Sequence, residues 1–80
     1  MDEYKAIMAG ELPEMEKLKA GFTWVTDQIL THTAQEIELL RALGDREALV
    51  KEQIKRSTVE HVRGIFEMCY RDAARGGGAQ

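Results

Sequence analysis

The sequence predicts an all-α protein built as an antiparallel helical hairpin of two long amphipathic helices. Apolar residues recur at steps of three and four along most of the chain, which is the spacing of a helix with one apolar side. The 80 residues include a single proline. One short break, at Gly44 and Asp45, divides the periodic region into two arms. Glycine suits the left-handed conformation that closes a helix, and aspartate is a good cap for the next helix.

Three segments are expected along the chain. They are a short N-terminal arm at 1–12, the hairpin domain at 13–75 and a disordered glycine-rich tail at 76–80. The arm carries a small apolar group that ends at Gly10, and this group fits either a helical turn or a loose arm. Because the connection at the break is so short, the two long helices are expected to be antiparallel neighbours.

The first long helix is expected to begin at Pro13, since proline at a first helical position loses no hydrogen bond. Its apolar stripe runs through Met15, Leu18, Phe22, Val25, Ile29, Thr33, Ile37, Leu40 and Leu43. An extra four-residue step follows Ile29. One irregular helix can continue through this point, or Thr33 to Glu36 can form a capping box that opens a new helix. The absence of glycine and proline from this part favours one helix.

The second long helix carries its own apolar stripe. The residues are Val50, Ile54, Thr58, Val62, Ile65, Cys69 and Ala73, and Leu49, Phe66 and Met68 widen it. Gly64 lies inside this helix at a cost of about 1 kcal/mol relative to alanine. A close helix–helix contact or a slight bend would explain it.

Two arms cannot cover both apolar stripes with each other alone, so the hairpins are expected to self-associate into a helical bundle. The expected core of this homo-oligomer comprises Ile29, Leu40, Ile54, Val62 and Ile65. Replacing Ile54 by alanine in such a core would cost about 2–4 kcal/mol. The surplus apolar area predicts an interaction surface made of Trp24, Leu30, Phe66 and Met68. Trp24 and Phe66 are the expected anchors, because aromatic side chains supply the most contact area.

Composition argues against several classes of partner. The chain has 11 basic and 14 acidic residues, and nucleic-acid binding needs a basic excess on some face. The basic residues of the second arm alternate with glutamates, which is typical of a solvated helix surface. No stretch reaches the ~18 apolar residues of a membrane span, and no apolar leader is expected at the N-terminus. With a single cysteine, Cys69, these features indicate a cytoplasmic protein.

No set of side chains fits catalysis or a metal. His32 and Glu36 are one turn apart, but a metal site needs further ligands that the sequence does not place nearby. Cys69 and His61 are eight residues apart, about 12 Å along a helix, so they cannot form a nucleophile and base within it. We interpret Cys69 as a buried apolar thiol. The sequence therefore predicts no enzyme activity, no cofactor and no metal.

The region around the break combines the end of a long helix at Ala34–Leu43, the break itself, and the stretch Glu47–Gln53, in which a glutamate precedes an apolar pair and a glutamine. With the amphipathic helix that follows, the segment Asp27–Ala74 resembles the phasins, which coat polyhydroxyalkanoate storage granules in bacteria. The resemblance covers somewhat over half of the chain. The sequence departs from the family in being short and in lacking a tail rich in alanine, proline and lysine.

The resemblance implies a non-catalytic coat protein that self-associates and lies on the apolar surface of a polyester granule. Helices with a wide apolar side and a charged outer side would adsorb to such a surface. The alternative is a small regulatory or adaptor protein that docks its hairpin on a specific protein partner.

Overall fold

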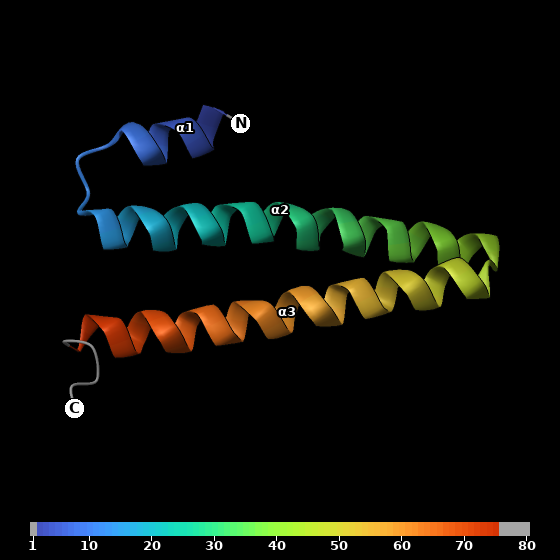
Figure 1. Cartoon of the computed structure of the whole chain (residues 1–80). Helices are drawn as coiled ribbons and strands as arrows, with labels where there is room; N and C mark the ends of the chain where they lie inside the picture. The colour runs from blue at the N-terminus through green and yellow to red at the C-terminus, as the bar shows by residue number, and fades with distance from the viewer. Residues whose placement is uncertain (1, 76–80) are drawn as a thin grey trace.

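The computed structural model describes residues 2–75, and within that range the chain forms three helices and no strand. They are α1 (Asp2–Ala9), α2 (Glu14–Leu43) and α3 (Arg46–Ala74). The two long helices run antiparallel side by side, and α1 lies against the opposite side of α2 (Figure 1). The prediction of an all-α helical hairpin is confirmed. The predicted disordered tail at 76–80 lies outside the described residues.

The turn between the long helices forms where glycine and aspartate predicted it. Gly44 adopts a left-handed conformation with φ 75°, and its N–H donates to the carbonyl of Arg41 at 3.2 Å. The Asp45 carboxylate accepts a hydrogen bond from the Ala48 N–H at 3.1 Å, which caps α3. Both ends are therefore satisfied by groups within the turn.

Helix α2 continues without interruption through Thr33, so the capping-box alternative is excluded. Thr33 is fully buried and lies inside the helix stripe, as its spacing predicted. At the other end, Pro13 precedes the first helical residue and serves as the N-cap position. Glu14 and Glu16 occupy the first turn, where their charge favours the helix dipole.

The N-terminal arm forms a helix that packs on α2. Eight residues are too few for a helix to be stable alone in water, so α1 depends on its contact with α2. The ring centroids of Tyr4 and Trp24 are 6.2 Å apart, and the Trp24 indole N–H donates to the Glu3 carboxylate at 3.2 Å. Gly21 is buried at this contact, and a Cβ there would collide with the terminal carbon of Met8 and lie 3.3 Å from the Tyr4 ring. The close approach of α1 to α2 therefore favours glycine at this position.

A leucine at position 21 is expected to displace α1, because the side chain would occupy the space of Met8 and Tyr4. Trp24 fluorescence in Gly21→Leu should shift to the red and become more accessible to acrylamide. The matched control is Gly64→Ala, since nothing lies within 4 Å of a Cβ at Gly64. It should leave the fluorescence unchanged and stabilise the fold by up to about 1 kcal/mol through helix propensity. An unshifted spectrum for Gly21→Leu would show that α1 does not pack there.

The molecule is a single layer of helices with little interior. Its Cα atoms extend over 49 × 34 × 10 Å. Among residues 2–75, Ile37 is the one large apolar side chain that is buried, at 3% exposure, and the polar residues Thr26 and Thr33 are buried as well. A layer one helix thick cannot enclose side chains from both of its faces. Most apolar side chains of the hairpin therefore remain in contact with solvent.

The side of α3 that packs on α2 differs from the predicted apolar stripe. Its partly buried residues are Ala48, Leu49, Glu52, Val59, Arg63, Phe66 and Tyr70. Most of them recur at steps of three and four, which is the seam of a two-helix coil. Polar side chains occupy much of this seam. Val50, Ile54, Val62 and Ile65 of the predicted stripe are exposed instead.

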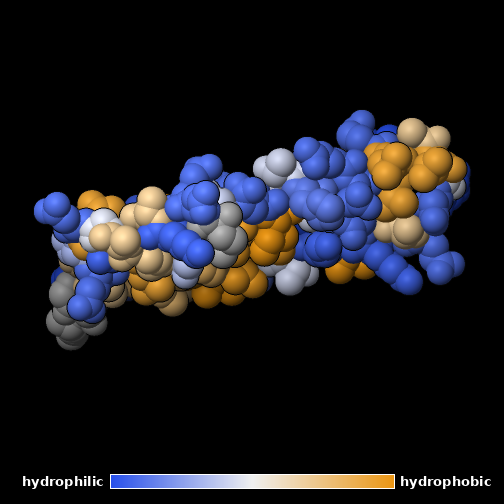
Figure 2. Space-filling model, turned by 90° about the horizontal axis from the view of Figure 1, so that it is seen from above, coloured by the Kyte–Doolittle hydropathy of each residue, from blue (hydrophilic) through white to orange (hydrophobic). Residues whose placement is uncertain are grey.

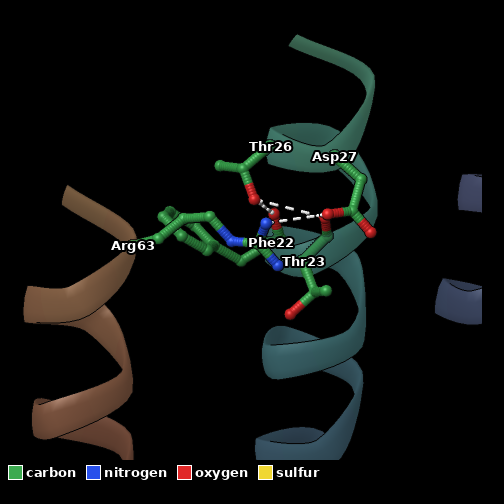
Figure 3. A network of polar contacts seen from close by, with 5 residues as sticks. All are labelled: Phe22, Thr23, Thr26, Asp27 and Arg63. Carbon is green, nitrogen blue, oxygen red and sulfur yellow. Dashed lines mark hydrogen bonds and ion pairs between the residues drawn. The ribbon is translucent and has the colours of Figure 1, made fainter. Parts of the chain in front are cut away.

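Specific contacts across the seam fix the register of the hairpin. The rings of Phe22 and Phe66 stack with centroids 4.2 Å apart. One turn further along, Arg63 reaches across to the Asp27 carboxylate at 2.8 Å, while the Thr26 hydroxyl donates to carbonyls of its own helix (Figure 3). A shift of either helix by one turn would break both the stack and the ion pair.

The open end of the hairpin is closed by Tyr70. Its hydroxyl donates to the Glu16 carboxylate, and this hydrogen bond raises the pKa of Tyr70 above its usual value, with smaller contributions from burial and from the negative charge of Glu16. The Lys19 ammonium lies 4.7 Å from the centroid of the same ring. Tyr70 thus joins α3 to two charged residues of α2.

Candidate interaction surface

One broad face of the layer is apolar. Leu18 and Cys69 line the same groove of about 190 Å³ between α2 and α3, together with Met15, Phe66, Tyr70 and Ala73. Helical spacing places Val25 and Ile29 on the same side of α2 as Leu18, and Ile65 and Val62 on the same side of α3 as Cys69, in both cases closer to the turn. We call these six residues, Leu18, Val25, Ile29, Val62, Ile65 and Cys69, the apolar face.

The apolar face is open to solvent in the single chain. Leu18 is 54% exposed, Ile65 46% and Val62 44%. Viewed along its edge, the molecule shows hydrophobic side chains gathered along one margin and hydrophilic side chains along much of the other (Figure 2). Figure 2 also shows hydrophobic side chains at the turn end of the molecule. Among the residues on either side of the turn, Leu39, Leu43, Val50 and Ile54 are exposed.

Helix α1, which packs on the side of α2 away from α3, adds apolar side chains next to the apolar face. A second groove of about 230 Å³ is lined by Leu18, Phe22 and Val25 of α2 and by Tyr4 and Met8 of α1, with Gly21 between them. Leu18 lines both grooves, so they open on the same face of the layer. Side chains from all three helices thus line grooves on this side of the layer.

The opposite face carries charge. One groove, of about 420 Å³, is lined by Lys19 of α2 and by Glu67, Tyr70 and Arg71 of α3. The other, of about 400 Å³, combines Glu16, Lys19 and Asp27 with the apolar side chains of Ile7, Leu12 and Trp24. We call this side the charged face. The two faces give the layer the amphipathic character that the periodicity of each helix predicted.

The residues predicted as an interaction surface are not brought together. Phe66 is half-buried in the hairpin seam against Phe22, and Trp24 is half-buried against α1. Leu30 is half-buried, while Met68 is 47% exposed. Phe66 instead joins α3 to α2 through its stack on Phe22, and Trp24 joins α2 to α1 through its contacts with Tyr4 and Glu3. The exposed apolar area comes from aliphatic residues that the sequence assigned to the hairpin stripes.

The residues predicted to form an oligomer core are largely unburied in the single chain. Ile29, Ile54, Val62 and Ile65 are all exposed, and Leu40 is half-buried. Their burial by a second copy stays a prediction. A Cβ at Gly64 would have no neighbouring atom within 4 Å, so a close contact inside the hairpin does not explain this glycine.

Cys69 is exposed, which corrects its interpretation as a buried thiol. Cys69 follows Phe66 by three residues and lies outside the seam between α2 and α3. Its side chain lines the groove that Leu18 also lines. His32 and His61 are exposed as well, and Glu36 is partly exposed. Within residues 2–75, no group of three or more histidine, cysteine, aspartate or glutamate side chains could hold a metal ion.

Sequence reasoning missed Gly21, whose role depends on which helix lies opposite. It also missed the polar seam residues Arg63 and Tyr70, which resemble ordinary surface side chains in the sequence. The heptad spacing from Leu49 to Tyr70 was the available signal, but the more hydrophobic stripe beside it dominated the pattern.

None of the helices described is both long enough and apolar enough to cross a membrane. Comparison with known proteins found no matching family model, no matching curated protein and no matching solved structure.

Proposed function

We propose that the chain is a non-catalytic, cytoplasmic amphipathic protein that uses its apolar face to bind an extended apolar surface, and that it self-associates through apolar side chains. By its resemblance to phasins, the surface is that of a polyester storage granule. The observation that carries the proposal is the exposure of the apolar face in a layer whose described residues bury a single large apolar side chain.

The shape of the molecule supports this function. In a layer 10 Å thick in its Cα atoms, the six side chains of the apolar face, which lie in the half of the hairpin toward its open end, can contact the surface at once. Each 100 Å² of apolar area removed from water contributes about 2.5 kcal/mol. The charged face would then point to water and keep coated granules apart through its mixed charges.

Introducing one negative charge on the apolar face is expected to abolish adsorption. Leu18→Glu and Ile65→Glu should each reduce the fraction that sediments with purified polyester granules at least about tenfold, because a carboxylate loses its water at an apolar surface. Both wild-type side chains are about half exposed, so the fold should survive these changes. Circular dichroism checks the helix content.

The matched control is Thr31→Glu, which adds the same charge at an exposed position of α2 that is 13 residues from Leu18 and about 140° around the helix. It should bind granules like the wild type. Equal loss in all three variants would show that net charge, and not the apolar face, controls adsorption. Wild-type protein that stays in the supernatant would refute the granule proposal.

The alternative function, docking on a specific protein partner, is favoured by the apolar group near the turn. Leu43 is 70% exposed there and Ile54 60%. A helical hairpin that presents a compact apolar end fits a groove on another protein. Wild-type protein that stays in the supernatant with granules but co-purifies with one stoichiometric protein partner would favour this alternative.

A further inference from the structure

We propose that, away from a granule, the apolar face is covered by a second copy of this chain, stacked face to face with both turns at the same end. The twofold axis of this dimer runs parallel to the helices, so that α2 of each copy lies over α3 of the other. This arrangement rests on the proposed function, because it assigns a second occupant to the same face.

The dimensions of the layer favour such a partner. A standard stable interface buries about 800 Å² on each partner. The broad side of a layer whose Cα atoms extend over 49 × 34 Å has room for an interface of this size. Stacking two layers would also produce a four-helix core of ordinary thickness.

The positions of the apolar side chains along the helix axes favour the dimer in which both turns lie at the same end. The Phe22–Phe66 stack and the Asp27–Arg63 ion pair show which parts of α2 and α3 lie at the same height. Val25 lies between those two levels. A twofold axis parallel to the helices preserves height, so Val25 of each copy would meet the stretch from Val62 to Ile65 in the other.

Two charged residues closer to the turn, Glu36 and Lys51, favour the same arrangement of the two copies. Glu36 lies eighteen residues, or five full helical turns, after Leu18, and Lys51 lies eighteen residues before Cys69. Because Leu18 and Cys69 share a groove, Glu36 and Lys51 project from the same face about 27 Å closer to the turn. Neither forms an ion pair within residues 2–75. In the dimer, each Glu36 would face Lys51 of the other copy.

The opposite arrangement, with the turn of one copy over the open end of the other, is unfavourable. It would place Glu36 and Lys51 against Leu18 and Cys69. Charges that lose water against apolar side chains without a partner are strongly destabilising. The pattern of apolar and charged residues therefore specifies the orientation as well as the face.

Charge reversal tests this pairing between chains. Glu36→Lys and Lys51→Glu should each weaken the dimer about tenfold in sedimentation velocity, since two symmetric pairs change from attraction to repulsion. An equimolar mixture of the two variants should restore the dimer, because both contacts are then again between opposite charges. Restoration by mixing cannot arise from a pair within one chain. Circular dichroism of each variant should match the wild type, since both side chains reach solvent.

The doubly reversed chain, Glu36→Lys with Lys51→Glu, should dimerise like the wild type. A monomeric wild type, a mixture that stays monomeric, or single variants that dimerise normally would overturn the arrangement. Granule sedimentation of Glu36→Lys separates this inference from the proposed function. A monomeric variant that binds granules supports both proposals, and a variant that binds but remains a normal dimer refutes only the pairing. A wild type that dimerises as described but does not sediment with granules refutes only the granule function.

Discussion

Replacing Ile37 by alanine is expected to destabilise the fold by about 2–4 kcal/mol. Among residues 2–75, Ile37 is the one large apolar side chain that is almost completely buried. Its truncation leaves a cavity, because a single layer of helices has few other side chains that could move in to fill it. A chain of this length has a total stability of about 4–12 kcal/mol. The substitution should therefore lower the midpoint of chemical unfolding, followed by circular dichroism, by a large fraction of its wild-type value.

The control is Ile54→Ala, which deletes the same atoms at a position that is 60% exposed. At protein concentrations where the chain is monomeric, it should cost less than about 0.5 kcal/mol. If Ile54 belongs to an oligomer core, its cost should rise with protein concentration, whereas the cost of Ile37→Ala should not. Equal costs for the two variants in the monomer would contradict the burial described for Ile37.

The helices and their break could be predicted because the signals are local. Gly44 and Asp45 determine the turn through their own backbone preferences, and Pro13 and the glutamates that follow it mark the start of α2. A helical hairpin then follows from the short connection. None of these inferences requires knowledge of which side chains meet across the molecule.

The face of α3 that meets α2 could not be predicted in the same way. Periodicity identifies an apolar stripe but not what covers it, and the stripe of Val50, Ile54, Val62 and Ile65 is the more hydrophobic one. In the single chain, α3 packs on α2 through the adjacent and more polar side that forms the seam. The stack of Phe22 on Phe66 and the bridge from Arg63 to Asp27 make this choice specific, and both depend on partners far away in the sequence.

The exposure of a surplus of apolar area could be predicted from the sequence, but the residues that form the exposed surface could not. A surplus of apolar area follows from counting residues on two amphipathic helices. Its location depends on which large side chains the hairpin uses for its own packing. Trp24 is half-buried because α1 is helical and docks beside it, and an eight-residue arm gives no strong helical signal. Aliphatic residues such as Leu18 and Ile65 remain outside.

Phe66→Ala is expected to lower stability by about 2 kcal/mol or more, since it removes a ring stacked 4.2 Å from Phe22 and 6.5 Å from Tyr70. The stack on Phe22 joins α2 and α3 near the open end of the hairpin, far from the turn. Loss of the ring should therefore speed amide hydrogen exchange at the C-terminal end of α3 more than near Gly44. Mass spectrometry of exchanged peptides resolves the two regions.

Met68→Ala is the matched control, because Met68 lies two residues further along α3 and is 47% exposed. Its cost should stay within about 0.5 kcal/mol and its exchange pattern should match the wild type. Any loss of granule binding by Phe66→Ala should then follow the loss of hairpin structure, and it should recover under conditions that restore helix content. Binding lost by a Phe66→Ala protein of wild-type stability would instead place Phe66 in direct contact with the bound surface.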